Sequence, residues 1–205
     1  MRSNWAISAV LLVLATGMAA TPADAQRSTT RGFNVAAHLQ GASLTVEGDE
    51  DDAASGGGFG ARVGYGFNRR FTGYLEVDGI VFDVENPDLE GEWAMAHIDL
   101  GMRFNFANSL NRWVPFLEGA LGARAVSVED ARSDGENVGK VTFSGGAASI
   151  GGGVAFFTSE KFALETLVKF TGGTFEQIDV GDVSVRNLDI EASSFRFKIG
   201  VSWWP

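Results

Sequence analysis

The sequence predicts an all-β fold, an eight-stranded antiparallel up-and-down transmembrane β-barrel. Three observations support this fold class. Apolar residues recur at every second position in eight segments, which is the period of a β-strand, and no segment has a convincing helical pattern. The connections between these segments alternate between short and long, and the charged residues sort with the kind of connection. The chain of 205 residues without cysteine has the length of a single domain.

Residues 1–25 are predicted to be a secretory signal peptide. Arg2 precedes an apolar run from Trp5 to Leu14, and the small residues around Asp24 form a typical cleavage pattern before Gln26. The apolar run is shorter than the roughly 20 residues that a membrane-spanning helix needs. No later apolar run approaches that length, so residues 26–205 can enter a membrane only as a closed barrel domain.

The eight predicted strands each place apolar residues on one face and polar or small residues on the other. In the second, Phe59, Val63 and Tyr65 alternate with glycines and Arg62. The seventh departs from the pattern, because Leu167 lies on its polar face. The predicted strands cover residues 33–44, 58–67, 71–82, 93–106, 114–128, 146–157, 162–171 and 195–203.

The predicted connections favour a membrane barrel over a soluble one. Short turns are expected at 68–70, 107–112 and 158–161, and long loops at 45–57, 83–92, 129–145 and 172–191. A soluble meander has no reason to keep all its long connections at one end, whereas outer-membrane barrels have short periplasmic turns and longer outer loops. Both termini are then periplasmic. A soluble, lipocalin-like carrier with the same topology remains an alternative.

The charged residues follow the same division. The long loops hold 19 of the 26 acidic residues and only three basic ones, whereas the short turns and the mature N-terminus carry a net positive charge. The charged strand residues all lie opposite the apolar face, and their signs nearly cancel, as a narrow closed interior requires. An eight-stranded barrel is just wide enough for side chains to fill. We therefore predict a lumen closed by a charge network of Arg62, Glu76, Asp78, Asp99, Arg103, Glu118, Arg124, Glu165, Lys169, Arg196 and Lys198.

With these features the chain resembles the small eight-stranded outer-membrane barrels of the OmpA/OmpX type, along its whole mature length. The resemblance implies a location in the bacterial outer membrane. The last strand, FRFKIGVSWW, looks like the aromatic-ended insertion signal of this family, which implies contact with the barrel-assembly machinery. The outward residues of that signal are Phe195, Phe197, Ile199, Val201 and Trp203. Trp204 and Pro205 follow the expected terminal aromatic, and this departs from the family pattern.

The expected function is a non-enzymatic, structural or surface-interaction role with acidic extracellular loops. Expected partners are outer-membrane lipid and lipopolysaccharide, with divalent cations or host and environmental surfaces as candidates at the loops. The acidic surface argues against nucleic acid. A narrow channel or transporter for small or hydrophobic molecules is the main alternative.

No catalytic, cofactor or metal site is expected. A lipid-modifying barrel enzyme is a further alternative, since His97 and Asp99 share one strand face, but no serine is placed beside them. His97 and His38 are both expected to be ordinary, satisfied interior residues. The segment around Asp130 and Asp134 resembles a calcium loop only in part, because Arg132 occupies a ligand position.

Overall fold

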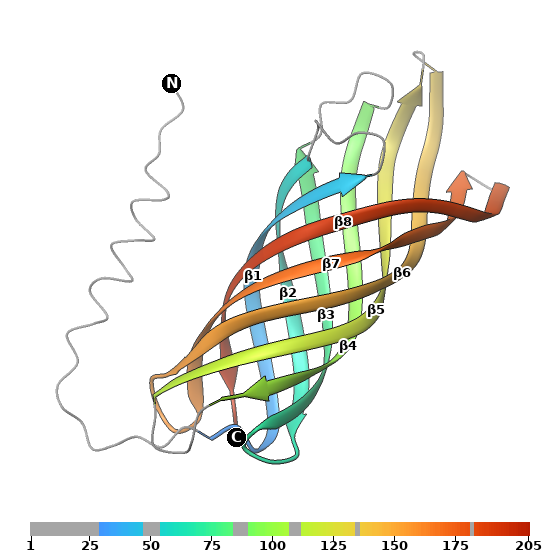
Figure 1. The fold of residues 1–205 in the computed structure, drawn as a ribbon. Helices are drawn as coiled ribbons and strands as arrows, with labels where there is room; N and C mark the ends of the chain where they lie inside the picture. Colours follow the sequence, from blue (N-terminus) through green and yellow to red (C-terminus); the bar gives the residue numbers. More distant parts are fainter. Residues whose placement is uncertain (1–28, 47–53, 84–89, 107–111, 134–135, 181–182) are drawn as a thin grey trace, which may run out of the picture.

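The computed structural model describes residues 29–46, 54–83, 90–106, 112–133, 136–180 and 183–205. Eight antiparallel strands pair in sequence order, and β1 pairs with β8 to close the barrel (Figure 1). The predicted fold class is confirmed. The predicted signal peptide lies outside the described residues. The strands are β1 (Gly32–Val46), β2 (Ala54–Gly66), β3 (Phe71–Asp83), β4 (Glu90–Asn105), β5 (Trp113–Ser133), β6 (Glu136–Phe157), β7 (Phe162–Val180) and β8 (Val183–Trp203).

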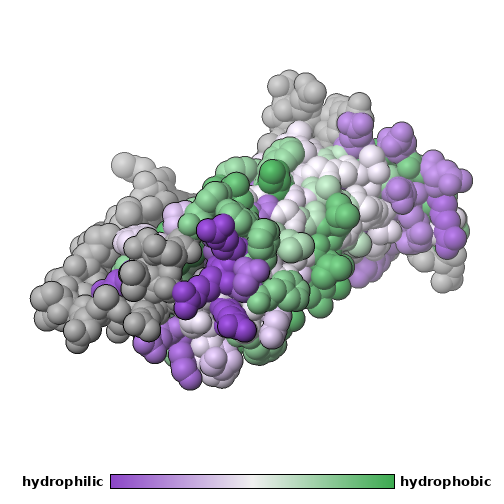
Figure 2. Space-filling model, turned by 60° about the horizontal axis from the view of Figure 1, so that its bottom comes forward, coloured by the Kyte–Doolittle hydropathy of each residue, from purple (hydrophilic) through white to green (hydrophobic). Residues whose placement is uncertain are grey.

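The strands alternate between an exposed apolar face and a buried face, as the period of two predicts. In β2 the burial changes at every residue, with Arg62 buried between the exposed Ala61 and Val63. Figure 2 shows apolar surface over the middle of the wall and hydrophilic residues toward both ends. An outward apolar band of this kind is the surface that a β-barrel presents to lipid. Among the described residues, no helix has the length and apolarity needed to span a bilayer.

Aromatic side chains form a belt at the end of the barrel that carries the short turns, which we call the turn end. Several contact one another in pairs on the outer surface, as in interfacial aromatic girdles. The ring-centroid distances are 5.6 Å for Tyr65 and Phe67, 5.2 Å for Phe71 and Phe104, 4.9 Å for Phe104 and Phe106, 4.6 Å for Trp113 and Phe156, and 6.4 Å for Phe162 and Trp203.

The opposite end, the loop end, differs from the sequence prediction. Long loops are predicted at 129–145 and 172–191, but most of these residues extend the strands β5 to β8, with only 134–135 and 181–182 between the paired strands. Beyond the bilayer the outer face does not contact lipid and need not be apolar. The apolar–polar alternation of the sequence therefore ends there, although the backbone hydrogen bonds between the strands continue. The extensions are held by inward apolar packing, in which Phe143 and Ile178 lie against the buried Val128 and Val141.

The β7–β8 pairing contains a bulge near the outer ends of the two strands. Phe175 pairs with Ile190 and Gln177 with Arg186, so three residues of β8 lie opposite one residue of β7. Asn187, inside this bulge, has a φ of 67° in the left-handed region, which asparagine tolerates better than most residues. Beyond the bulge β7 is still paired with β6, as far as Val180 opposite Val141.

Candidate functional site in the barrel interior

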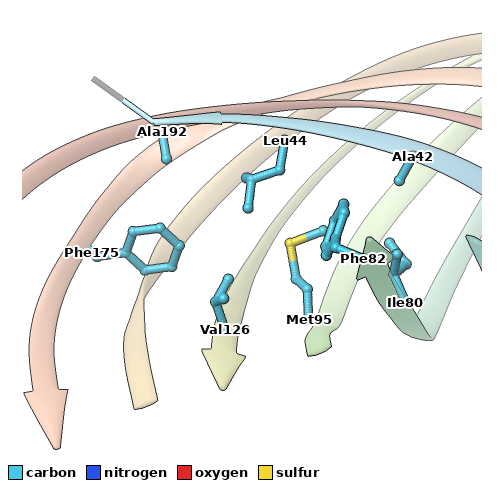
Figure 3. Packing of buried hydrophobic residues seen from close by; sticks show 8 residues of the cluster. All are labelled: Ala42, Leu44, Ile80, Phe82, Met95, Val126, Phe175 and Ala192. Atoms are coloured by element: carbon cyan, nitrogen blue, oxygen red, sulfur yellow. The ribbon is translucent and has the colours of Figure 1, made fainter. Parts of the chain in front are cut away.

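The interior side chains form three layers along the barrel axis. The charge layer in the middle holds the buried ionic residues of the strands. Below it lies the turn-end cluster, formed by Val114, Phe116, Ala155, Phe157, Ala163, Leu167 and Trp204. Above it lies the loop-end cluster, formed by Ala42, Leu44, Ile80, Phe82, Met95, Val126, Phe175 and Ala192 (Figure 3).

Glycines on the inner face make room for the long charged side chains. A Cβ added at Gly60 would collide with the side chains of Asp78 and His38. At Gly122 a Cβ would collide with Asp99. The glycine-rich inner faces are therefore what allows the charge layer to fit inside a barrel of eight strands.

The eleven charged residues named from the sequence are all buried, from 0% exposure at Arg196 to 9% at Glu165. Glu76 binds three of the cations. Its Oε2 accepts from Arg62 Nη2 at 2.6 Å, and its Oε1 accepts from Lys169 Nζ at 2.6 Å and from Lys198 Nζ at 2.8 Å. These residues belong to β2, β3, β7 and β8. The contacts therefore join strands that are far apart in the sequence.

Asp78 organises the side of the charge layer next to β1. Its Oδ2 accepts from Arg196 Nη1 and Lys198 Nζ, both at 2.6 Å, and its Oδ1 lies 2.6 Å from His38 Nε2. Arg196 Nη2 also donates to Thr171 Oγ1 at 2.6 Å. His38 is thus a bonded interior residue.

Arg103 joins the charge layer to the turn-end cluster. Its Nη2 lies 3.0 Å from Glu118 Oε2 and its Nη1 lies 2.9 Å from Glu165 Oε2. The guanidinium stacks on the Phe116 ring, 3.6 Å from the ring centre. Lys169 adds a contact to Glu118 at 3.2 Å.

Ten of the eleven residues form a neutral ion-pair network. Each of the five cations lies within 4 Å of at least one carboxylate, and each of the five carboxylates lies within 4 Å of at least one cation. Buried charges are tolerated when they are paired in this way. The members are Arg62, Arg103, Lys169, Arg196, Lys198, Glu76, Asp78, Asp99, Glu118 and Glu165.

Arg124 is the exception. It is 2% exposed, and its Nη2 donates to the backbone carbonyls of Gly173 at 2.7 Å and Ala192 at 2.8 Å. Within the described part of the chain it has no carboxylate partner, and its Nε and Nη1 have no hydrogen-bond partner. The structure therefore places Arg124 in the interior but outside the ion-pair network.

The histidines do not form a catalytic arrangement among the described residues. His97 Nε2 lies 3.2 Å from Met95 Sδ, its Nδ1 has no hydrogen-bond partner among the described residues, and Asp99 contacts Lys169 and Arg196 instead. A general base has to lie within hydrogen-bond reach of its orienting group and of the nucleophile. The His97–Asp99 pairing considered for an enzyme is absent among the described residues. His97 is buried as predicted, but its Nδ1 is not satisfied within the described part of the chain.

One group of side chains has the composition of a metal site. Ligand atoms of His38, Glu76 and Asp78 lie within 4.8 Å of one another. Their carboxylates already accept from lysine and arginine side chains, including Lys198, which binds both acids. Positive charge therefore occupies the space that a metal ion would need.

The residues of the expected insertion signal lie on the outer face of β8. Phe195, Phe197 and Val201 are exposed, as are Ile199 and Trp203. Trp204, in contrast, is buried in the turn-end cluster, and its backbone N–H donates to the Lys161 carbonyl at 2.7 Å. Recognition of the outward residues during insertion stays a prediction.

The alternation of the sequence does not reveal the two apolar layers. Phe116, Leu167 and Phe175 share the strand face of the charged residues, so face alone does not distinguish them. A usable signal is the position of each inward apolar residue along its strand, since these residues fall on either side of the charged ones.

The comparisons with known proteins agree with this geometry. Residues 9–203 match the family described as outer membrane protein beta-barrel domain. No curated protein sequence matches the chain.

Solved structures share the fold at low sequence identity. Neisserial surface protein A has a TM-score of 0.62 at 16% identity, with 84% of this chain and 96% of that chain covered. Ail of Yersinia pestis has a TM-score of 0.53 at 15% identity, with 85% and 100% covered. OprG of Pseudomonas aeruginosa has a TM-score of 0.54 at 12% identity, with 86% and 97% covered. These matches, with the closed barrel and its apolar band, set aside the soluble alternative, and the chain belongs to the outer membrane protein beta-barrel family of the bacterial outer membrane.

Proposed function

We propose that this protein is a non-enzymatic outer-membrane barrel with an occluded lumen, and that it acts through the surface of its loop end. The observation that carries the proposal is the neutral ion-pair network between two apolar layers. A solute crossing the barrel would have to pass both apolar layers and separate the buried ion pairs between them. Breaking one buried pair costs about 3–5 kcal/mol.

The turn-end cluster supports occlusion below the charge layer. Phe157, Val114 and Trp204 are almost fully buried there, and Arg103 stacks on Phe116 directly above them. Close-packed protein interiors leave few voids larger than a water molecule. An occluded lumen leaves the outer surfaces as the place where the protein meets its partners.

The loop end supports a role in cation-bridged contact. Glu176, Asp189 and Glu191 are exposed on the β7–β8 hairpin, and Glu129 is exposed on β5, where Lys140 neutralises it at 3.0 Å. Other acidic residues of the sequence, such as those at 47–52, lie outside the described residues. Carboxylate oxygens are the ligands that calcium and magnesium prefer, so these ions can bridge the hairpin to lipopolysaccharide phosphates.

The comparison with Ail is informative by contrast. Ail has been solved in complex with the heparin analogue sucrose octasulfate, a polyanion. The acidic hairpin here would repel such a ligand unless a cation lies between them. The proposed partners are therefore neighbouring lipopolysaccharide or an environmental surface, bound through divalent cations.

A binding assay tests this role. The refolded barrel in non-ionic detergent is passed over immobilised lipopolysaccharide in magnesium, and then in sodium of equal ionic strength with EDTA. We expect binding that needs magnesium and is weakened several-fold in the Glu176→Gln/Asp189→Asn/Glu191→Gln variant. Glu160→Gln, an exposed acid of the turn end, is the matched control and should bind like the wild type. Binding that ignores both EDTA and the triple substitution would contradict the proposed role.

A further inference from the structure

We propose that Arg124, with His97 beside it, forms the floor of a binding site for a single-chain amphipathic anion in the loop-end half of the barrel. The head group would be a carboxylate, sulfate or phosphate ester at Arg124, and the alkyl tail would lie among the side chains of the loop-end cluster. This site goes beyond the proposed surface role and does not depend on it.

The first argument is the charge balance of the interior. The five cations and five carboxylates of the ion-pair network already neutralise one another, and Arg124 adds one positive charge that no described carboxylate meets. Burial of an unpaired charge is costly, and a bound anion removes that cost. The excess charge thus specifies the sign of the ligand.

The second argument is the geometry of the guanidinium. Only Nη2 is used, for the carbonyls of Gly173 and Ala192, and Nε and Nη1 remain as buried donors without partners among the described residues. The guanidinium carbon lies over the Phe175 ring, 4.5 Å from its centre. Two oriented donors on one buried arginine suit an oxyanion head group.

His97 supplies a third polar group at the same level. It is the direct cross-strand partner of Arg124, and its Nδ1 is buried without a partner in the described part of the chain. In a sheet, side chains of such partners stand about 5 Å apart at their Cβ atoms. The pairing brings both side chains to the same part of the interior, and Nδ1 donates to an anion there in the tautomer that carries the proton on this nitrogen.

The surroundings of Arg124 specify the apolar part of the ligand. Phe175 and Ala192 contact Arg124, Met95 contacts His97, and all three belong to the loop-end cluster. Figure 3 shows Phe175, Val126, Met95 and Leu44 projecting into the barrel from different strands. A tail that enters from the loop end has to part these side chains, and the unbranched thioether of Met95 changes conformation readily. A small hydrated anion would gain nothing from this layer.

Native mass spectrometry with decanoate as the probe tests the proposal. The folded barrel in non-ionic detergent is equilibrated with decanoate, with the neutral decanol, or with acetate, and is then released from the detergent in the spectrometer. The fraction of barrels that carry one bound probe molecule is measured as a function of probe concentration. Arg124→Met removes the charge at similar side-chain length, and Lys140→Met removes an exposed cation of the same end as a matched control. We expect one saturable decanoate adduct, at least tenfold weaker in Arg124→Met, unchanged in Lys140→Met and absent with decanol and acetate.

Three results would overturn the site. These are equal decanoate affinity in the wild type and Arg124→Met, equal affinity for decanol, or saturation by acetate at the same concentration as decanoate. If Arg124→Met does not fold, the unfolding temperature of the wild-type barrel is measured with each probe instead. Decanoate should then raise the unfolding temperature while decanol at the same concentration does not, and equal shifts would refute the proposal.

Discussion

Lys169 of β7 and Glu76 of β3 meet inside the barrel, with 2.6 Å between Lys169 Nζ and Glu76 Oε1, although the two strands lie on opposite walls. The residues are 93 positions apart in the sequence. Glu76 also binds Arg62 and Lys198, so one carboxylate holds cations from three other strands. The charge layer therefore ties the walls of the barrel together.

Glu76→Gln should destabilise the folded barrel strongly. Removing this carboxylate leaves Arg62, Lys169 and Lys198 with fewer buried partners, and breaking a buried pair costs about 3–5 kcal/mol. Urea unfolding in lipid vesicles, followed by tryptophan fluorescence, measures the free energy of unfolding. Glu129→Gln breaks an exposed pair with Lys140 and should change that free energy by less than about 1 kcal/mol. Equal losses in the two variants would show that the buried network does not hold the barrel.

The alternation of the sequence predicts the faces of the strands well, and the physical reason is the bilayer. Within the membrane, an outward residue such as Leu100 must be apolar, and an inward residue such as Asp99 has to fit a narrow lumen. Because successive residues of a strand face opposite sides, these two requirements produce a period of two in the sequence. The period alone therefore suffices to place the eleven charged residues on one face.

Other features cannot be read from that period. The hairpin extensions are predicted as loops because no lipid constrains the outer face there, and the backbone ladder alone defines those strands. The pairing of Lys169 with Glu76 depends on strand tilt and register, which no local pattern encodes. The face of Arg124 groups it with the network, whereas its guanidinium binds the backbone carbonyls of Gly173 and Ala192 and none of the described carboxylates.

Leu100→Arg should test where the outer wall meets lipid. Leu100 is 70% exposed on the outer face in the middle of β4, and an arginine there should cost about 2–4 kcal/mol of unfolding free energy. Val183→Arg is the matched control, since Val183 is 65% exposed at the tip of the β7–β8 hairpin, where the cost should be about 0–1 kcal/mol. Both are measured by unfolding from vesicles. A similar cost at the two positions would mean that lipid does not define the band around Leu100.

Asn187→Val should loosen the β7–β8 hairpin, because a β-branched residue is disfavoured at the left-handed φ of 67°. Asn187→Gly should leave the hairpin as it is, since glycine adopts this conformation freely. Hydrogen exchange of peptides covering 175–190 is the measurement, with faster exchange expected only in the valine variant. If both substitutions leave exchange unchanged, the bulge does not depend on this residue.

The last two tryptophans should respond differently to lipid. Trp203 is 40% exposed on the outer surface and stacks with Phe162, whereas Trp204 is 3% exposed within the turn-end cluster. In variants that keep one tryptophan and replace the others with phenylalanine, brominated lipid should quench Trp203 strongly and Trp204 weakly. The reverse order would place the last strand in the other register, with Arg196 and Lys198 facing lipid.

The most direct test of the occluded lumen is the conductance of single wild-type barrels in planar lipid bilayers. The heat-dependent mobility of the protein in gels is used first to verify that the barrel is folded. An absence of current then means that the lumen does not conduct, and not that the protein is unfolded. We predict no stable conductance steps at either polarity, because a solute would have to pass the buried ion pairs and the apolar clusters on either side of them. Reproducible steps that increase with the number of inserted barrels, and that change in Glu76→Gln, would contradict the account.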